Sequence, residues 1–252
     1  MARHRLKGPI FRRESGSLQP KRAIILAVEG QVTEVQYFEG LNEAIVNGRT
    51  RFPNDVVIHV LRCTDTRSDP GSVIDLLEEH IERSSVYSDV LLNRYEAQDD
   101  DEVAATREYP HDDVLGIVID HDHRTDLRDH IEHCRAKRYD VFLTTPCFEL
   151  WLLCHYEDVA EKYSQEELYS NERVSKQHTF VSRKVSEVSH SNKRVDFERK
   201  MLPNLYDAIE RSKKLATDIY ELLHKPGTNM ALLFEIIEGT RRSMWDDVKV
   251  NA

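Results

Sequence analysis

The sequence lacks any long hydrophobic run. No apolar stretch approaches the roughly 18 residues that a membrane-spanning helix needs. The first residues, MARHRLKGPIFRRESGSLQPKR, also lack the apolar core of a signal peptide. We therefore expect a cytoplasmic protein without a membrane partner.

Cysteine is scarce and scattered. The four cysteines follow no C-x-x-C pattern, which argues against a disulfide framework and against a thiolate zinc site. We expect them to be small buried hydrophobic side chains instead. Internal repeats and low-complexity tracts are also absent, and the 252 residues suit either one globular domain or a domain with an added lobe.

Negative charge is in excess over the whole chain, but two regions are basic. The formal net charge is −10. However, residues 1–22 carry seven Lys/Arg and one acid, residues 93–113 carry eight acids and two arginines, and residues 171–214 carry eleven Lys/Arg and six acids. The two basic regions could bind a phosphate backbone, because local patches matter more than the total charge. The same distribution also fits an ordinary solvated surface.

Short apolar runs alternate with amphipathic segments in the first two thirds of the chain. This alternation predicts an α/β fold, with a parallel sheet covered by helices on both faces. The predicted helices cover about 34–46, a segment from about 70, about 126–137, and a segment from Pro146. The predicted strands are 23–28, 55–63, 114–120 and 140–145.

The chain divides into three regions by composition. We predict a basic flexible arm at 1–22 and an α/β domain at 23–159, with an acidic insertion at about 93–113. Residues 160–252 show no convincing strand and form a predicted helical C-terminal region. Within it, one long amphipathic helix is expected from about residue 202 until Pro226 and Gly227 stop it.

Acidic residues follow two of the predicted strands. Glu29 ends the first strand, and Asp120 with Asp122 ends the third. Functional groups gather at the carboxyl ends of strands in open α/β sheets, so these carboxylates can converge if the two strands are neighbours. Three such charges favour a hard divalent cation, which can polarise a phosphodiester and activate water. Capping of the following helices would explain the same acids without any metal.

Other polar residues lie near the same strand ends. Because side chains alternate across a strand, His121 and His123 should face away from the two aspartates. Arg62, Arg67 and Arg124 are placed where they could hold phosphates.

Four stretches carry a resemblance to known proteins. A Glu after the first strand and Asp-x-Asp after a later one resembles the Toprim domain, and more of the chain is similar to the RloB-like family of bacterial defence proteins. The sequence departs from that pattern in its acidic 93–113 insertion and in TTPCFE, where Thr stands in place of an expected Ser-Asn. The matching stretches are ILAVEGQVTEVQYFEGL (25–41), VIDHDH (118–123), TPCFELWLLCHYED (145–158) and KPGTNMALLFEII (225–237).

The resemblance implies roles for individual residues. It makes Glu29 a general acid/base or metal ligand, and it makes Asp120 and Asp122 ligands of Mg²⁺ or Mn²⁺. Glu34 and Glu149 are weaker candidates for the same metal. A surface position would account equally well for Glu34, and Glu149 could pair with a structural partner because an ionised side chain in its apolar run is costly.

The resemblance also implies a function. We expect a metal-dependent Toprim nuclease that cleaves phosphodiesters in RNA or DNA during antiphage defence by abortive infection. An ATPase of the AAA/ABC kind is the implied protein partner. Two other functions remain open from the residues: a non-catalytic binding or signalling module of a defence complex, and phosphoryl transfer on nucleotides.

Overall fold

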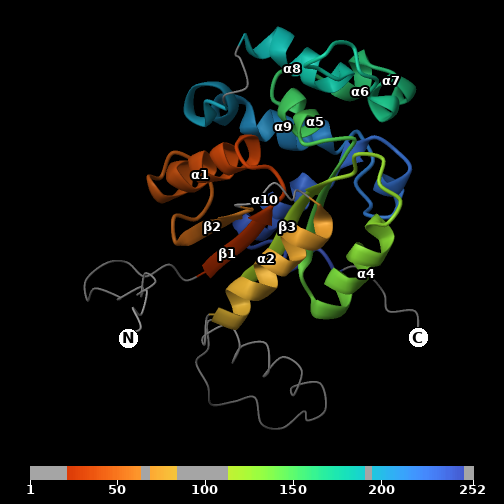
Figure 1. The fold of residues 1–252 in the computed structure, drawn as a ribbon. Coiled ribbons are helices and arrows are strands. Elements are labelled where there is room, and N and C mark those ends of the chain that lie inside the picture. Colours follow the sequence, from red (N-terminus) through yellow and green to blue (C-terminus); the bar gives the residue numbers. More distant parts are fainter. Residues whose placement is uncertain (1–21, 64–68, 84–112, 191–194, 247–252) are drawn as a thin grey trace, which may run out of the picture.

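A five-stranded sheet forms the centre of the computed structural model, which describes residues 22–63, 69–83, 113–190 and 195–246 (Figure 1). The strand order is β2-β1-β3-β4-β5, and every neighbouring pair is parallel except β4 with β5. The strands are β1 (Arg22–Val28), β2 (Val56–Arg62), β3 (Val114–Asp120), β4 (Asp140–Thr145) and β5 (Gly227–Thr228).

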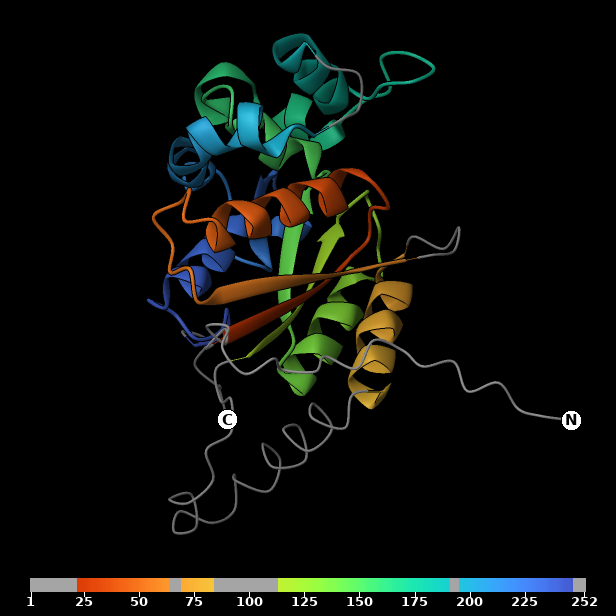
Figure 2. The same cartoon turned by 90° about the vertical axis from the view of Figure 1, so that its left-hand side faces the viewer.

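Helices cover both faces of this sheet. Figure 2 shows α1 on one side of the strands and α2 with α4 on the other. Successive side chains of β1 point to opposite faces of the sheet. Leu26 packs in the layer that contains α1, and Ala27 packs in the layer that contains α2 and α4. The first layer contains α1 (Thr33–Val46), α5 (Glu149–Cys154), α9 (Leu205–Ser212) and α10 (Met230–Glu238), and the second contains α2 (Pro70–Arg83) and α4 (Leu127–Lys137).

A group of short helices lies beyond α5 and α9 at one end of the molecule (Figure 1). We call residues 159–190 the helical lobe. Its last helix packs against α5, which joins the lobe to the sheet domain. The lobe consists of α6 (Val159–Lys162), α7 (Gln165–Ser170) and α8 (Phe180–Ser189), and the chain continues through η1 (Phe197–Met201), η2 (Leu202–Asn204) and η3 (Glu221–Leu223).

The C-terminal part of the chain returns to the sheet. The buried side chain of Asn229 continues the β5 pairing, since its Oδ1 accepts from the Leu143 N–H and its Nδ2 donates to the Val141 carbonyl, both at 2.8 Å. The apolar helix α10 then packs on the α1 face of the sheet. Residues after 160 therefore build part of the central core.

The predicted α/β fold and its four parallel strands are confirmed, with strand ends that differ by one residue at most. The four cysteines are free and buried, as expected. None of the described helices combines the length and apolar character that a bilayer crossing requires. Of the predicted basic arm, residues 1–21 lie outside the described residues, and so does the acidic insertion up to residue 112.

The prediction of one long helix after residue 202 is wrong. The α-helix ends at Ser212, and Ala216 instead forms a β-bridge with Gly227. A Cβ at Gly227 would overlap the backbone of Ala216, so glycine permits this close approach. Backbone pairing at the sheet edge thus overrides an amphipathic pattern that favours a helix. The same pairing adds β5, which the sequence did not predict.

Two helix starts also differ from expectation. Helix α1 begins at Thr33, one residue before the predicted start at about Glu34. Pro146 lies before α5 in a cis peptide bond with Thr145, and the helix begins only at Glu149. Residues 146–148, which include Cys147, therefore form a short connection between β4 and α5.

Candidate active site

The acids after β1 and β3 meet because the two strands are direct neighbours. The backbone N–H of Glu29 donates to the Val118 carbonyl at 3.1 Å and so extends the parallel pairing. The Glu29 carboxylate accepts the Asp120 N–H at 3.1 Å and the Arg124 guanidinium at 2.6 Å. Glu29 is therefore held at the base of the turn that carries the aspartates.

Glu29 is almost fully buried, with 6% of its surface exposed. Burial raises the pKa of this carboxyl, while the Asp120 N–H and the Arg124 guanidinium oppose the rise. By alternation along β1, its side chain follows Ala27 toward the α2 and α4 layer. Glu29 thus holds the Asp120 backbone and Arg124 from the α2 and α4 side of the sheet.

A tight turn after β3 directs Asp122. Asp122 and His123 both adopt the left-handed backbone conformation, with φ of 42° and 57°. Two consecutive non-glycine residues in this region are unfavourable, and such strain is common at functional sites. Backbone bonds maintain the turn: the Asp122 N–H donates to the Pro146 carbonyl, and the Arg124 N–H donates to the His121 carbonyl.

The two histidines of VIDHDH contact the C-terminal part of the chain and the helical lobe. His121 is buried, and its Nε2 donates to the Leu223 carbonyl at 3.1 Å while its Nδ1 accepts the His123 N–H. Burial lowers the pKa of His121 and so favours this neutral form. The His123 ring lies edge-on to Tyr169 of α7 at 5.3 Å. These side chains therefore support the turn and connect it to the helical lobe.

The remaining candidate acids lie on the α1 and α5 side. Asp120, Asp122 and Glu149 line a pocket of about 530 Å³ between the strand ends and the helical lobe. Glu149 is the first residue of α5, where the helix dipole favours a negative charge. The sheet and α5 thus bring three of the five sequence candidates to one cavity.

Glu34 lies close to these acids, in the first turn of α1 and buried. A Cβ at Gly30 would overlap the Glu34 carboxylate, so glycine after Glu29 makes room for this second acid. Burial raises the pKa of Glu34 to about 7, and the charges of Glu149 and Glu29 add to that rise. The alternative of an exposed surface glutamate is therefore wrong.

Mutual repulsion is the main electrostatic property of this group. We call Glu29, Glu34, Asp120, Asp122 and Glu149 the acidic cluster. Burial, followed by the charges of Glu34 and Glu149, raises the pKa of Asp120 well above its usual value. Such a cluster is costly without a counter-charge, and a bound cation would supply one.

The donor chemistry of the cluster fits Mg²⁺ or Mn²⁺. Carboxylate oxygens are the preferred ligands of these hard ions, and Mg²⁺ needs only one or two of them because it keeps several waters. Within the described ranges, no three His, Cys, Asp or Glu side chains are gathered as a ready metal-binding group. Asp120, Asp122 and Glu149 share the pocket, whereas Glu29 is occupied by Arg124.

The opposite wall of the pocket was not predicted. It comes from the segment between α7 and α8, from α8 itself and from the chain that follows. The only sequence signal is the polar and basic composition of residues 171–214, which does not identify individual residues. This wall contributes Asn171, Arg173, Gln177, His178, Thr179, Ser182, Val185, Ser186, Ser189 and Val195.

The arginines expected near the strand ends have different positions. Arg124 contacts Glu29, as described above. Arg62 is the exposed last residue of β2, and Arg67 lies outside the described residues. Of these three arginines, only Arg124 is shown in contact with a residue of the acidic cluster.

One comparison with known proteins identifies a family. A family model described as RloB-like protein matches residues 24–237, which is most of the chain and includes the whole acidic cluster. No match was found among curated proteins or among solved structures.

Proposed function

The chain belongs to the RloB-like protein family, and we propose that it is a metal-dependent nuclease of the Toprim type that acts in antiphage defence. Membership in this family suggests a defence-associated protein. The reaction would be hydrolysis of a phosphodiester bond in RNA or DNA. A partner ATPase of the AAA/ABC kind is part of the same proposal.

The observation that carries the proposal is the acidic cluster beside an open pocket. Burial raises the pKa values of Glu34 and Asp120, and carboxylates with such raised pKa values concentrate at functional sites. Here three of the acids face a cavity of about 530 Å³, which is large enough for a small ligand or one unit of a polymer.

In this proposal Asp120, Asp122 and Glu149 would hold the metal ion. A bound Mg²⁺ or Mn²⁺ polarises the phosphodiester and lowers the pKa of water. Glu29 would orient Arg124, because the two form a 2.6 Å ion pair within the site. The guanidinium, held by this pair, would stabilise negative charge on a phosphate oxygen beside the acidic cluster.

The test of activity uses labelled RNA, single-stranded DNA and plasmid, each incubated with the purified protein in Mg²⁺ or Mn²⁺. We expect cleavage that the double variant Asp120→Asn, Asp122→Asn reduces by at least about 100-fold, the usual cost of removing transition-state charge stabilisation. Asp129→Asn, an exposed change on α4, is the matched control and should retain activity. Undiminished cleavage by the double variant would refute the proposed metal ligands.

Metal binding provides a test that does not depend on cleavage. Calorimetric titration with Mg²⁺ should show binding to the wild type and none to the double variant. The ion should also raise the melting temperature of the wild type, because a ligand that binds only the folded state stabilises it. Absence of binding at millimolar Mg²⁺ would instead favour a non-catalytic binding module.

A further inference from the structure

The pocket has two chemically different walls. Acids form the wall at the strand ends, whereas the wall from the lobe is mostly uncharged and polar. We infer that this pocket accepts one unpaired nucleotide of a single-stranded nucleic acid, with Arg173 binding its phosphate. The inference rests on the proposed function and specifies the form of its substrate.

The lobe wall is anchored to the acidic wall. Asn171 joins the two walls. Its Nδ2 donates to the sulfur of Cys147 on the acidic side at 3.7 Å, and its Oδ1 accepts the N–H of Val181 in α8 at 3.0 Å. Cys147 lies two residues before Glu149. The segment between α7 and α8 therefore has a defined position opposite the acids.

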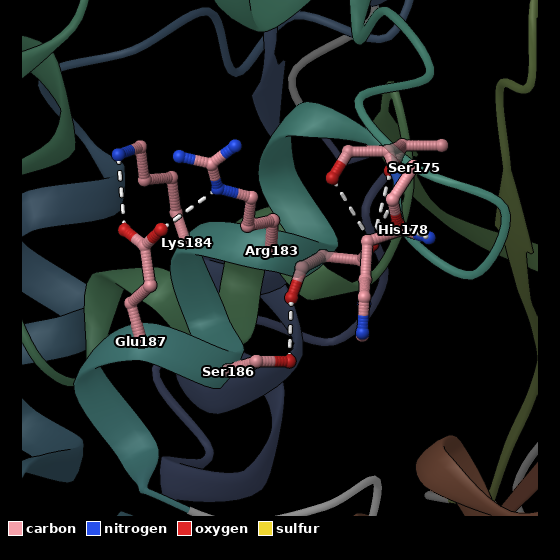
Figure 3. A network of polar contacts seen from close by, with 8 residues as sticks. Ser175, His178, Arg183, Lys184, Ser186 and Glu187 are labelled. Atoms are coloured by element: carbon pink, nitrogen blue, oxygen red, sulfur yellow. Dashed lines mark hydrogen bonds and ion pairs between the residues drawn. The ribbon is translucent and has the colours of Figure 1, made fainter.

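This segment is a hairpin that presents Arg173. Arg173 and Thr179 form an antiparallel bridge, and the Phe180 N–H donates to the Glu172 carbonyl at 2.8 Å. At the tip, the Ser175 hydroxyl accepts the N–H of His178 at 3.0 Å (Figure 3). Arg173 and His178 thus reach the pocket from a hydrogen-bonded loop.

The positive charges of α8 are already engaged elsewhere. Glu187 forms ion pairs with Arg183 at 2.8 Å and with Lys184 at 3.0 Å, as Figure 3 shows. Arg173, in contrast, is in none of the ion pairs seen among the described residues, and it is the single Lys or Arg in the described lining of the pocket. Its guanidinium can therefore bind a phosphate, for which its planar donors are well suited.

The rest of the pocket suits a base and a sugar. Hydroxyl, amide and imidazole groups of the lobe wall offer hydrogen bonds, and apolar side chains offer packing surface. A base inside a duplex is stacked and paired, and enzymes that enclose a base must first take it out of the stack. A cavity of about 530 Å³ therefore favours a nucleotide that is already unpaired. The apolar lining consists of Val32, Leu152, Val185, Val195 and Met201.

The test is a binding measurement. Fluorescence anisotropy would compare a labelled single strand with the same strand in a perfect duplex, in Ca²⁺, with ribose and deoxyribose versions of each. We expect the single strand to bind at least about tenfold more tightly than the duplex. Comparison of the ribose and deoxyribose strands shows whether RNA or DNA is preferred, and either preference is compatible with the inference.

Matched variants locate the binding site. Arg173→Ala and Arg183→Ala each remove one positive charge from the same lobe, but only the first lies in the pocket. We expect Arg173→Ala to weaken single-strand binding about tenfold and Arg183→Ala to change it less than twofold. Val185→Trp should fill the pocket and weaken single-strand binding at least as much as Arg173→Ala does. Circular dichroism and thermal melting would confirm that this variant is folded.

The outcomes separate this inference from the proposed function. Equal binding of duplex and single strand, or equal effects of the two arginine variants, would overturn the inference even if metal-dependent cleavage is observed. Conversely, Arg173-dependent binding of single strands without any cleavage would support the inference and refute the nuclease.

Discussion

The two walls of the pocket are built in different ways. The acidic wall stands at the carboxyl ends of β3 and β4 and at the start of α5, and parallel pairing with Thr144 fixes Asp120. The lobe wall stands on a hairpin and on α8, in which only Val181 and Ser189 are buried. The acidic wall therefore belongs to the rigid centre of the fold, while the lobe wall has few buried contacts to resist change.

The walls also differ in their effect on stability. In the acidic cluster, burial and neighbouring negative charges raise the pKa values of Glu34 and Asp120, so their ionised forms cost stability. Several hydroxyls of the lobe wall are hydrogen-bonded within it, as when the Ser186 hydroxyl donates to the Ser182 carbonyl at 2.9 Å. Substitutions in the acidic wall should thus trade activity against stability, and those in the lobe wall should not.

The largest expected effect comes from Asp120→Asn. The pKa of Asp120 is raised, so its ionised form destabilises the fold at neutral pH, and the neutral amide removes that cost. We expect at least about 100-fold slower cleavage together with a higher melting temperature. Ser186→Ala in the lobe wall should shift neither quantity strongly. A lower melting temperature for Asp120→Asn would contradict the conclusion that the acidic wall costs stability.

A pH effect is expected beneath the acidic wall, at His155 after α5. This buried imidazole donates through Nδ1 to the Met201 carbonyl and accepts from the Tyr37 hydroxyl. Burial lowers its pKa to about 3, from 6.5. The unfolded chain binds the extra proton between these values, so stability falls as the pH falls below 6.5.

The expected contribution of His155 between pH 7 and pH 5 is a loss of about 2 kcal/mol in the free energy of unfolding. Urea unfolding at the two pH values would measure it. The variant His155→Gln should be less stable at pH 7 but should lose about 2 kcal/mol less than the wild type on acidification. An identical loss in both proteins would rule out a neutral, buried His155.

A smaller effect is expected from Gly30→Ala. The new methyl group would overlap the Glu34 carboxylate, which can move away because it ends a flexible side chain. We expect cleavage to slow about tenfold while stability changes by less than about 1 kcal/mol. In a Glu34→Ala background the same substitution should have no further effect, and a double-mutant cycle would measure this coupling.

The smallest effect concerns the strained turn. His123→Gly relieves a left-handed backbone conformation but also removes the ring contact with Tyr169. Arg138→Gly relieves the same conformation at the end of α4, where the side chain is exposed. We expect a gain of up to about 1 kcal/mol for Arg138→Gly and a smaller gain for His123→Gly. Thermal melting of both variants would give the contribution of the contact that joins the acidic wall to the lobe.

The sheet could be predicted from the sequence because its strands are buried on both faces. Runs such as AIILAV and VLGIVID are almost purely apolar, and they leave little choice of structure. The proximity of Glu29 and Asp120 was expected if their strands were neighbours, because the carboxyl ends of adjacent parallel strands lie at one edge, and β1 does pair with β3. The helix predicted after residue 202 failed because its apolar stripe carries no information about the pairing of Ala216 with Gly227.

What the sequence determined by itself is local: which segments are strands and which acids end them. These properties depend on periodicity and burial within a few residues. Only the tertiary structure decided that Arg124 pairs with Glu29, that Gly30 admits Glu34, and that a hairpin carrying Arg173 closes the pocket. Those contacts join residues far apart in the chain, and their existence depends on how whole layers pack rather than on any local pattern.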